Sequence, residues 1–163
     1  NHYLVDPPRI KNPLSHYLCH NNITSFAISE TQKYGHVTYF WNGNNSGYIN
    51  KNLETYIEIP SDTIPFDQAP KMKASEITEK TIELLNSGNY QFGRINFPNG
   101  DMVGHTGRVS AARCAVEAVD ACLGDLLDAI GESPEWVALV TADHGNCEMM
   151  IDAEGTVLPY PAE

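Results

Sequence analysis

Basic side chains are scarce in this 163-residue sequence, which has 10 lysines and arginines against 21 aspartates and glutamates and a net charge of −11. A nucleic-acid groove needs clustered lysine and arginine to contact phosphates, so this composition argues against nucleic-acid binding. An acidic surface suits the binding of cations, although it equally suits a surface that is simply solvated. The charge therefore excludes one class of partner without assigning a function.

Cysteine pairs and long apolar runs are also missing. The four cysteines form no CxxC pair, which excludes a zinc finger and is typical of the thiols of an intracellular protein. No run approaches the roughly 18 apolar residues of a membrane span, and the first residues lack the basic-then-apolar pattern of a signal peptide. We therefore expect a soluble cytoplasmic protein that makes no membrane contact.

Length and hydrophobic content suffice for a single domain with a buried core. Residues 23–29 and 36–41 are β-branched and aromatic runs bounded by polar residues and glycine, a composition typical of strands. Residues 54–60 alternate between polar and apolar side chains, which predicts a half-exposed strand.

Two helices are predicted in the second half of the sequence. The first begins near Ala74, with Ser75 as a possible N-cap, and Gly88 ends it. The second spans residues 109–130 and ends at Gly131. It has the strongest periodicity in the chain, because its apolar residues recur at steps of three and four: Val109, Ala112, Val116, Val119, Leu123, Leu126 and Ile130.

Strands are predicted on both sides of this second helix. Residues 92–97 precede it, and residues 136–141 follow it as an apolar run without alternation, which is typical of a strand covered on both faces in a parallel sheet. The order strand, helix, strand is that of a βαβ unit, so the fold class is predicted to be α/β with a mainly parallel sheet. In such sheets ligands bind at the carboxyl ends of the strands.

Acidic and histidine side chains follow both of these strands. The segment "INFPNGDMVGHTG" places Asp101 and His105 after residues 92–97, and "TADHGN" places Asp143 and His144 after residues 136–141. Both pairs should therefore reach the same edge of the sheet. Mixed carboxylate and imidazole ligands suit divalent transition metals such as manganese or zinc, so we expect a metal site there.

These same motifs carry a resemblance to a known family. "NFPNGDMVGHTG" and "VTADHGN" resemble the phosphatase domain of the cofactor-independent phosphoglycerate mutases, within the alkaline phosphatase superfamily, and "SETQKYGHVTYFWNG" and "EAVDACLGDLLDAI" match in the same order. The resemblance implies a three-layer fold with a mainly parallel sheet. It also implies the interconversion of 3-phosphoglycerate and 2-phosphoglycerate in glycolysis and gluconeogenesis, by phosphoryl transfer through an enzyme serine.

The resemblance further implies roles for individual residues. Asp101 and His105 match two ligands of the metal that holds the substrate, and Asp143 and His144 match ligands of the metal beside the serine. Lys33 matches a lysine that contacts the transferring phosphoryl group. Two divalent ions are therefore expected, with manganese first and magnesium, cobalt or zinc as alternatives, and no bisphosphoglycerate. Metals and a lysine together can activate a hydroxyl and offset phosphoryl charge.

Only part of the family pattern is present. No segment resembles the family's N-terminal serine and its neighbouring aspartate ligand, and the phosphotransferase domain is absent, so residues 1–163 are expected to form a partial metalloenzyme domain, incomplete at both ends. No histidine follows His144, and Asn45 stands where many relatives have an arginine. We expect this chain alone to be inactive, and the longer parent protein to be a monomeric isomerase that acts on phosphoglycerate.

Two alternatives stay open. Another enzyme of the superfamily, such as a phosphopentomutase, an alkaline phosphatase or an archaeal-type mutase, could share the metal-site motifs. A degenerate domain that binds a metal or a partner without catalysis would also retain them. Assays of mutase and phosphatase activity distinguish these possibilities.

Overall fold

A three-stranded parallel sheet forms the middle layer of the molecule. The computed structural model describes residues 4–5, 10–131 and 135–158. The strands are β1 (Ser25–Glu30), β2 (Glu54–Ile59) and β3 (Phe92–Asn96), in the order β2-β1-β3. They confirm the strands predicted at residues 23–29, 54–60 and 92–97.

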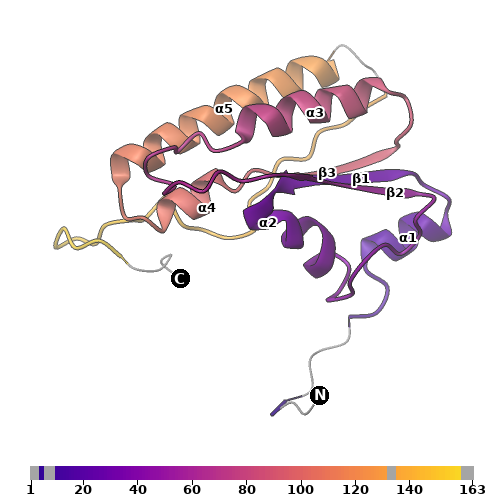
Figure 1. The fold of residues 1–163 in the computed structure, drawn as a ribbon, viewed down its shortest axis with the longest axis horizontal. Coiled ribbons are helices and arrows are strands. Elements are labelled where there is room, and N and C mark those ends of the chain that lie inside the picture. Colours follow the sequence, from indigo (N-terminus) through magenta and orange to yellow (C-terminus); the bar gives the residue numbers. More distant parts are fainter. Residues whose placement is uncertain (1–3, 6–9, 132–134, 159–163) are drawn as a thin grey trace.

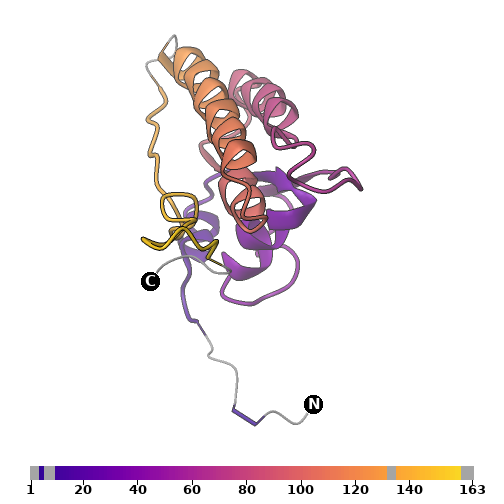
Figure 2. The same ribbon diagram turned by 90° about the vertical axis from the view of Figure 1, so that its left-hand side faces the viewer.

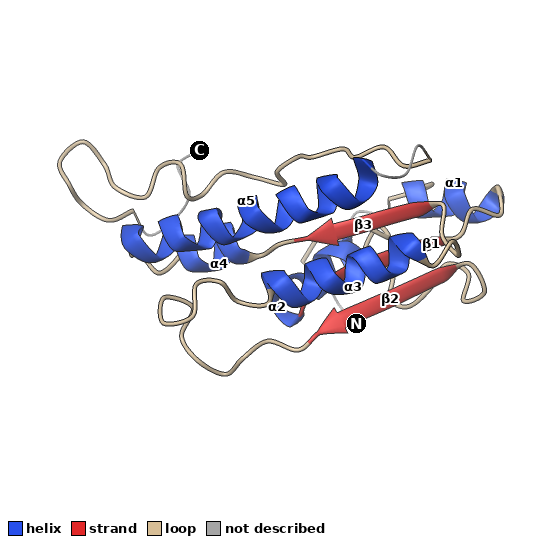
Figure 3. Cartoon of the chain, turned by 90° about the horizontal axis from the view of Figure 1, so that it is seen from above, coloured by secondary structure: helices blue, strands red, loops and turns tan. Residues whose placement is uncertain are grey.

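Helices cover both faces of this sheet (Figure 1). The long helices α3 (Ala74–Asn86) and α5 (Val109–Gly131) lie side by side over one face, as the view from above also shows (Figure 3). The opposite face carries α1 (Leu14–His20), α2 (Thr31–Gly35) and the π-helix η1 (His36–Phe40), while the short helix α4 (Asn99–Gly104) connects β3 to α5. The layers confirm the predicted three-layer α/β fold. No helix in the described part of the chain is long and apolar enough to span a membrane.

The core is built on β1, whose six residues are all buried because it is the central strand. Phe26 and Ile28 pack against Ile77 and Leu84 of α3. Full burial of a large aliphatic or aromatic side chain contributes about 1.5–3 kcal/mol. This cluster therefore fixes α3 on the sheet.

A second apolar cluster joins the start of α5 to the C-terminal segment. Val103 of α4 packs with three alanines of α5, and Met150 completes the cluster. Figure 2 shows the chain after α5 returning as an extended segment toward this end of the helix. The cluster thus keeps the segment after residue 141 close to α4.

The prediction of a strand at residues 36–41 is wrong, since these residues form η1 and the turn after it. The segment that follows β1 satisfies its backbone through helical hydrogen bonds and does not add a strand to the β2-β1-β3 sheet. Arg94 of β3 also donates from Nε to the carbonyl oxygen of Val37 at 2.7 Å. Tertiary contacts here outweigh the strand propensity of β-branched and aromatic residues.

The prediction of a covered strand at residues 136–141 is also wrong. This segment forms no ladder, and Val137 and Leu139 are each 91% exposed. Among the described residues β3 pairs only with β1, and an apolar run without a partner strand has nothing to satisfy its backbone in a sheet. The proposed βαβ unit therefore consists here of a strand, a helix and an extended segment.

The predicted helix ends are partly confirmed. Gly88 lies just beyond α3 with φ of +68°, the left-handed conformation that commonly ends helices. Ser75 is not the N-cap, because α3 begins one residue earlier and Lys73 precedes it. In α5 the predicted stripe is only partly buried: Leu126 faces the core, whereas Val116 is exposed.

Candidate functional site

The candidate site lies where β1 and β3 end. β1 leads directly into α2, which carries Lys33, and β3 is followed by α4, which carries Asp101 and has His105 as its C-cap residue. Because the strands are parallel, both helices stand at the same edge of the sheet (Figure 1).

Lys33 and Asp101 form an ion pair at the centre of the site. Lys33 Nζ lies 2.6 Å from Asp101 Oδ2, and the two side chains are only 7% and 14% exposed. Burial by itself would raise the pKa of Asp101. The hydrogen bonds from Lys33 and Asn146, with the charges of Lys33 and His105, outweigh burial and hold this pKa below its usual value. Asp101 is therefore an ionised acceptor at neutral pH.

Both predicted histidines approach the same carboxylate. Nε2 of His105 lies 3.0 Å from Asp101 Oδ1, and Nε2 of His144 lies 3.8 Å from that oxygen. His144 Nε2 is also 3.7 Å from Asp143 Oδ2. The structure thus brings all five predicted residues together at one edge, although residues 136–141 form no strand.

The histidine of the second pair is oriented for ligation. His144 Nδ1 lies 2.9 Å from the carbonyl oxygen of Gly145. A carbonyl oxygen can only accept, so Nδ1 carries the proton of this bond, and in the neutral imidazole the lone pair for ligation is then on Nε2.

The carboxylate and imidazole donors of each Asp/His pair fit a divalent metal, although each pair offers only two ligand side chains. Ligand atoms held about 2.0–2.2 Å from one ion lie roughly 3–3.5 Å from each other. The 3.0 Å between His105 Nε2 and Asp101 Oδ1 matches this spacing, and the 3.7 Å between His144 and Asp143 is slightly wider. Within the described ranges, no group of three or more histidine, cysteine or acidic side chains is arranged to hold an ion.

Sequence reasoning missed Asn146, which is buried between the two pairs. Its Nδ2 atom donates to Asp101 Oδ1 at 2.8 Å and to the Asp101 carbonyl oxygen at 3.1 Å. Next to it, Cys147 donates from Sγ to the carbonyl oxygen of Gly100 at 2.7 Å. The only available signal was position, because Asn146 closes the "DHGN" motif.

His36 was also missed, and it belongs to the electrostatic surroundings of the site. Partial burial and the positive charge of Lys33 lower its pKa, against the opposing effect of Asp143 and Asp101. Its ring packs against Phe40, with 5.1 Å between centroids. No sequence pattern distinguished it from a strand residue.

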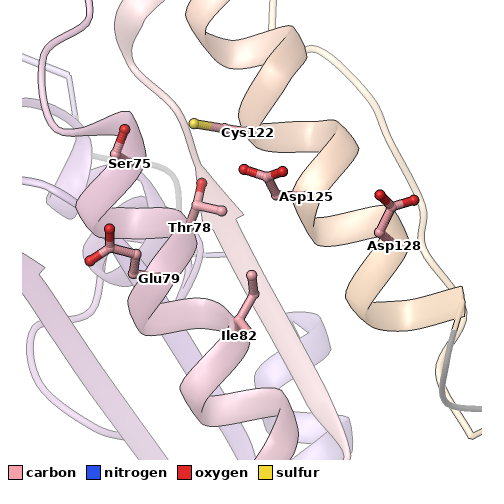
Figure 4. A pocket seen from close by; sticks show the side chains of 7 residues that line it. All are labelled: Ser75, Thr78, Glu79, Ile82, Cys122, Asp125 and Asp128. Carbon is pink, nitrogen blue, oxygen red and sulfur yellow. The ribbon is translucent and has the colours of Figure 1, made fainter.

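A groove of about 410 Å³ lies elsewhere, between α3 and α5 (Figure 4). Seven residues line it, three of them acidic: Ser75, Thr78, Glu79, Ile82, Cys122, Asp125 and Asp128. None of the predicted site residues lines it. The candidate site at the sheet edge and this groove are therefore separate places in the fold.

A sequence model of the Metalloenzyme superfamily matches residues 3–162. The chain belongs to this superfamily. Within it, a 2,3-bisphosphoglycerate-independent phosphoglycerate mutase of Trypanosoma brucei brucei is 47% identical over 98% of this chain and 30% of its own length. The enzyme of the same name from Ricinus communis is 51% identical, over 98% of this chain and 29% of its own length.

A solved phosphoglycerate mutase structure has the same fold over the matched region. The crystal structure of Leishmania mexicana phosphoglycerate mutase at low cobalt concentration matches with a TM-score of 0.86 and 48% sequence identity, over 91% of this chain and 29% of that one. The resemblance to the cofactor-independent phosphoglycerate mutases is thereby confirmed. The chain spans about 30% of the length of these relatives.

Proposed function

We propose that this chain is part of a cofactor-independent phosphoglycerate mutase, an isomerase that interconverts 3-phosphoglycerate and 2-phosphoglycerate. The observation that carries the proposal is the buried Lys33–Asp101 pair, with His105 and His144 both within 4 Å of the same carboxylate. The names of the similar proteins support the same activity.

In this proposal residues 1–163 supply part of the metalloenzyme domain. The nucleophilic serine, its neighbouring aspartate and the phosphotransferase domain belong to the rest of a longer protein, which accords with the share of its relatives that the chain spans. The isolated chain is accordingly inactive in our proposal, because the group that accepts the phosphoryl is not among its matched motifs.

Asp101 and His105 would hold one divalent ion, and Asp143 and His144 would hold the other, with manganese as the expected metal. A relative studied at low cobalt concentration supports a divalent requirement in the family. Such ions, when bound, depress the pKa of a serine or substrate hydroxyl and offset negative charge. The low pKa of Asp101 keeps its carboxylate charged for this purpose.

Lys33 would contact the transferring phosphoryl group. Its ammonium is paired with the Asp101 carboxylate and its side chain is only 7% exposed, so little solvent reorganisation is needed when phosphoryl oxygens approach. A preorganised charge of this kind stabilises the negative charge that develops during transfer. Asp101 orients the lysine until the substrate arrives.

The proposal extends to the cellular setting. We place the longer protein in the cytoplasm, in glycolysis and gluconeogenesis, as a monomer that needs no bisphosphoglycerate. Four free cysteines and an excess of acidic residues accord with a cytoplasmic protein that does not bind nucleic acid.

The decisive experiment uses the longer protein with manganese and no bisphosphoglycerate. Conversion of 3-phosphoglycerate to 2-phosphoglycerate is followed by a coupled assay, with phosphatase and phosphopentomutase substrates run in parallel. Lys33→Ala should reduce kcat on the order of a hundredfold. Lys80→Ala, which removes an exposed lysine paired only with Glu83, should leave it unchanged. Normal turnover in Lys33→Ala would return Lys33 to a structural role, and activity only on the other substrates would replace the proposed reaction.

A further inference from the structure

The amide of Asn146 makes two bonds to one residue of the candidate site. Both bonds, to the carboxylate and to the backbone carbonyl of Asp101, come from Nδ2. An asparagine amide has two hydrogens on this nitrogen, so both are used. The side chain is 8% exposed, and water therefore competes little for these bonds.

The surroundings hold Asn146 in this place. Gly104 of α4 packs so closely that a β-carbon there would collide with the Asn146 amide. The backbone N–H of Asn146 donates to Glu148 Oε2 at 2.7 Å, and the neighbouring Cys147 bonds to Gly100. The Asn146 side chain is therefore held on one side by its close approach to Gly104 of α4 and on the other by the hydrogen bonds of its own loop.

We propose that Asn146 is the positioning residue for Asp101, and that its amide fixes both the orientation of this carboxylate and the distance between the two Asp/His pairs. The inference rests on the metal-binding part of the proposed function. Asn146 and the pair Asp143 and His144 share one loop, and among the described residues no strand pairing joins this loop to the sheet. The Met150 cluster and the Cys147 bond hold the loop against α4, and the bonds from Asn146 to Asp101 are the contacts that reach the carboxylate itself.

Lys33 already places one positive charge beside Oδ2 of Asp101. The amide of Asn146 orients Oδ1 through a hydrogen bond without adding a second positive charge that would repel an approaching cation. Outer partners of metal ligands typically contribute about 10- to 100-fold to metal affinity. Loss of the amide should therefore weaken metal binding even though Asn146 itself need not touch the ion.

The test measures metal binding by this chain directly, without an activity assay. Manganese binding is titrated by calorimetry and by the EPR signal of free Mn²⁺, and the visible absorption of added Co²⁺ reports coordination geometry. Asn146→Leu keeps the branching and the number of heavy atoms of the side chain but removes the donors. We expect its affinity for Mn²⁺ to fall about 10- to 100-fold and its Co²⁺ spectrum to change.

Asn99→Leu is the matched control, because Asn99 is a fully buried asparagine of α4, the helix that carries Asp101. Among the described residues its amide donates to the carbonyls of Pro70 and Lys71 and not to the candidate site. This variant should lower thermal stability but leave the Mn²⁺ affinity within about twofold. Gly104→Ala, which displaces the amide, should reproduce the metal defect of Asn146→Leu.

Equal loss of affinity in both asparagine variants, or wild-type affinity in Asn146→Leu, would overturn the inference. Failure of the unmodified chain to bind Mn²⁺ or Co²⁺ at millimolar concentration would also overturn it, since Asn146 would then have no metal ligand to position. The mutase assay of the longer protein is independent of these results. If the longer protein has mutase activity but Asn146→Leu leaves the Mn²⁺ affinity unchanged, this inference is refuted and the proposed function is not.

Discussion

The Lys33 ammonium and the Asp101 carboxylate, 2.6 Å apart and almost fully buried, connect the helix that follows β1 to the helix that follows β3. This pair crosses the edge of the sheet at which every predicted site residue lies. We therefore expect both residues of the pair to contribute to the stability of the fold as well as to the proposed reaction.

Lys33→Met should destabilise the chain by about 3 kcal/mol, because removal of one partner leaves a buried charge without compensation. The free energy of unfolding is measured in urea. Lys80→Met, at an exposed pair with Glu83, should change it by less than about 0.5 kcal/mol. The double variant Lys33→Met/Asp101→Asn should recover part of the loss, and a further additive loss would show that the pair is not energetically coupled.

Glu30→Gln should stabilise the chain at neutral pH. Glu30 is 2% exposed, and its burial raises its pKa above the ordinary 4.5, against the opposing effect of the bond from the Lys73 backbone N–H. Between the ordinary and the raised pKa the folded state binds more protons than the unfolded state, so wild-type stability falls as pH rises.

The glutamine variant does not titrate and keeps an oxygen that can accept from the Lys73 N–H. Its stability advantage over wild type should be absent below about pH 4, grow as pH rises through the raised pKa, and then stay constant. Urea unfolding at several pH values measures it. If the stability advantage of Glu30→Gln over wild type were largest at acid pH, the pKa of Glu30 would not be raised in the folded state.

Gly93→Ala should destabilise the chain by about 1–3 kcal/mol, the usual cost of overpacking. A β-carbon at Gly93 of β3 would collide with the Phe26 ring in the core. Gly124 lies within α5 with nothing near its added β-carbon, so Gly124→Ala should stabilise the chain by about 0.5–1 kcal/mol. Thermal unfolding compares the stabilities of the two variants. If Gly93→Ala stabilised the chain as much as Gly124→Ala does, the Phe26 ring would have moved aside without cost.

Leu139→Ala should change the free energy of unfolding by less than about 0.5 kcal/mol, because this side chain is exposed. Phe26→Ala removes a completely buried ring and should cost about 3–5 kcal/mol. Chemical unfolding of both variants provides the comparison. A loss of several kcal/mol at Leu139 would show that residues 136–141 are buried in solution.

The sequence alone determined the features that depend on neighbouring residues. Helix periodicity located α5, Gly88 marked the end of α3, and the alternation at residues 54–60 indicated β2. The motifs also predicted that the two Asp/His pairs meet at one sheet edge. The physical reason, coincident carboxyl ends of parallel strands, holds for Asp101 and His105, which follow β3. It does not hold for Asp143 and His144, because residues 136–141 form no strand and tertiary contacts of the following loop bring this pair to the edge.

Only the tertiary structure decided the features that depend on distant partners. A strand forms only where a neighbouring strand pairs with it. Among the described residues, neither residues 36–41 nor residues 136–141 pair with the β2-β1-β3 sheet, although both runs have strand-like composition. The two bonds from Asn146 to Asp101 likewise join segments that are far apart in sequence. No local pattern encodes such a bond, because it forms only when folding has brought both groups out of water and within reach.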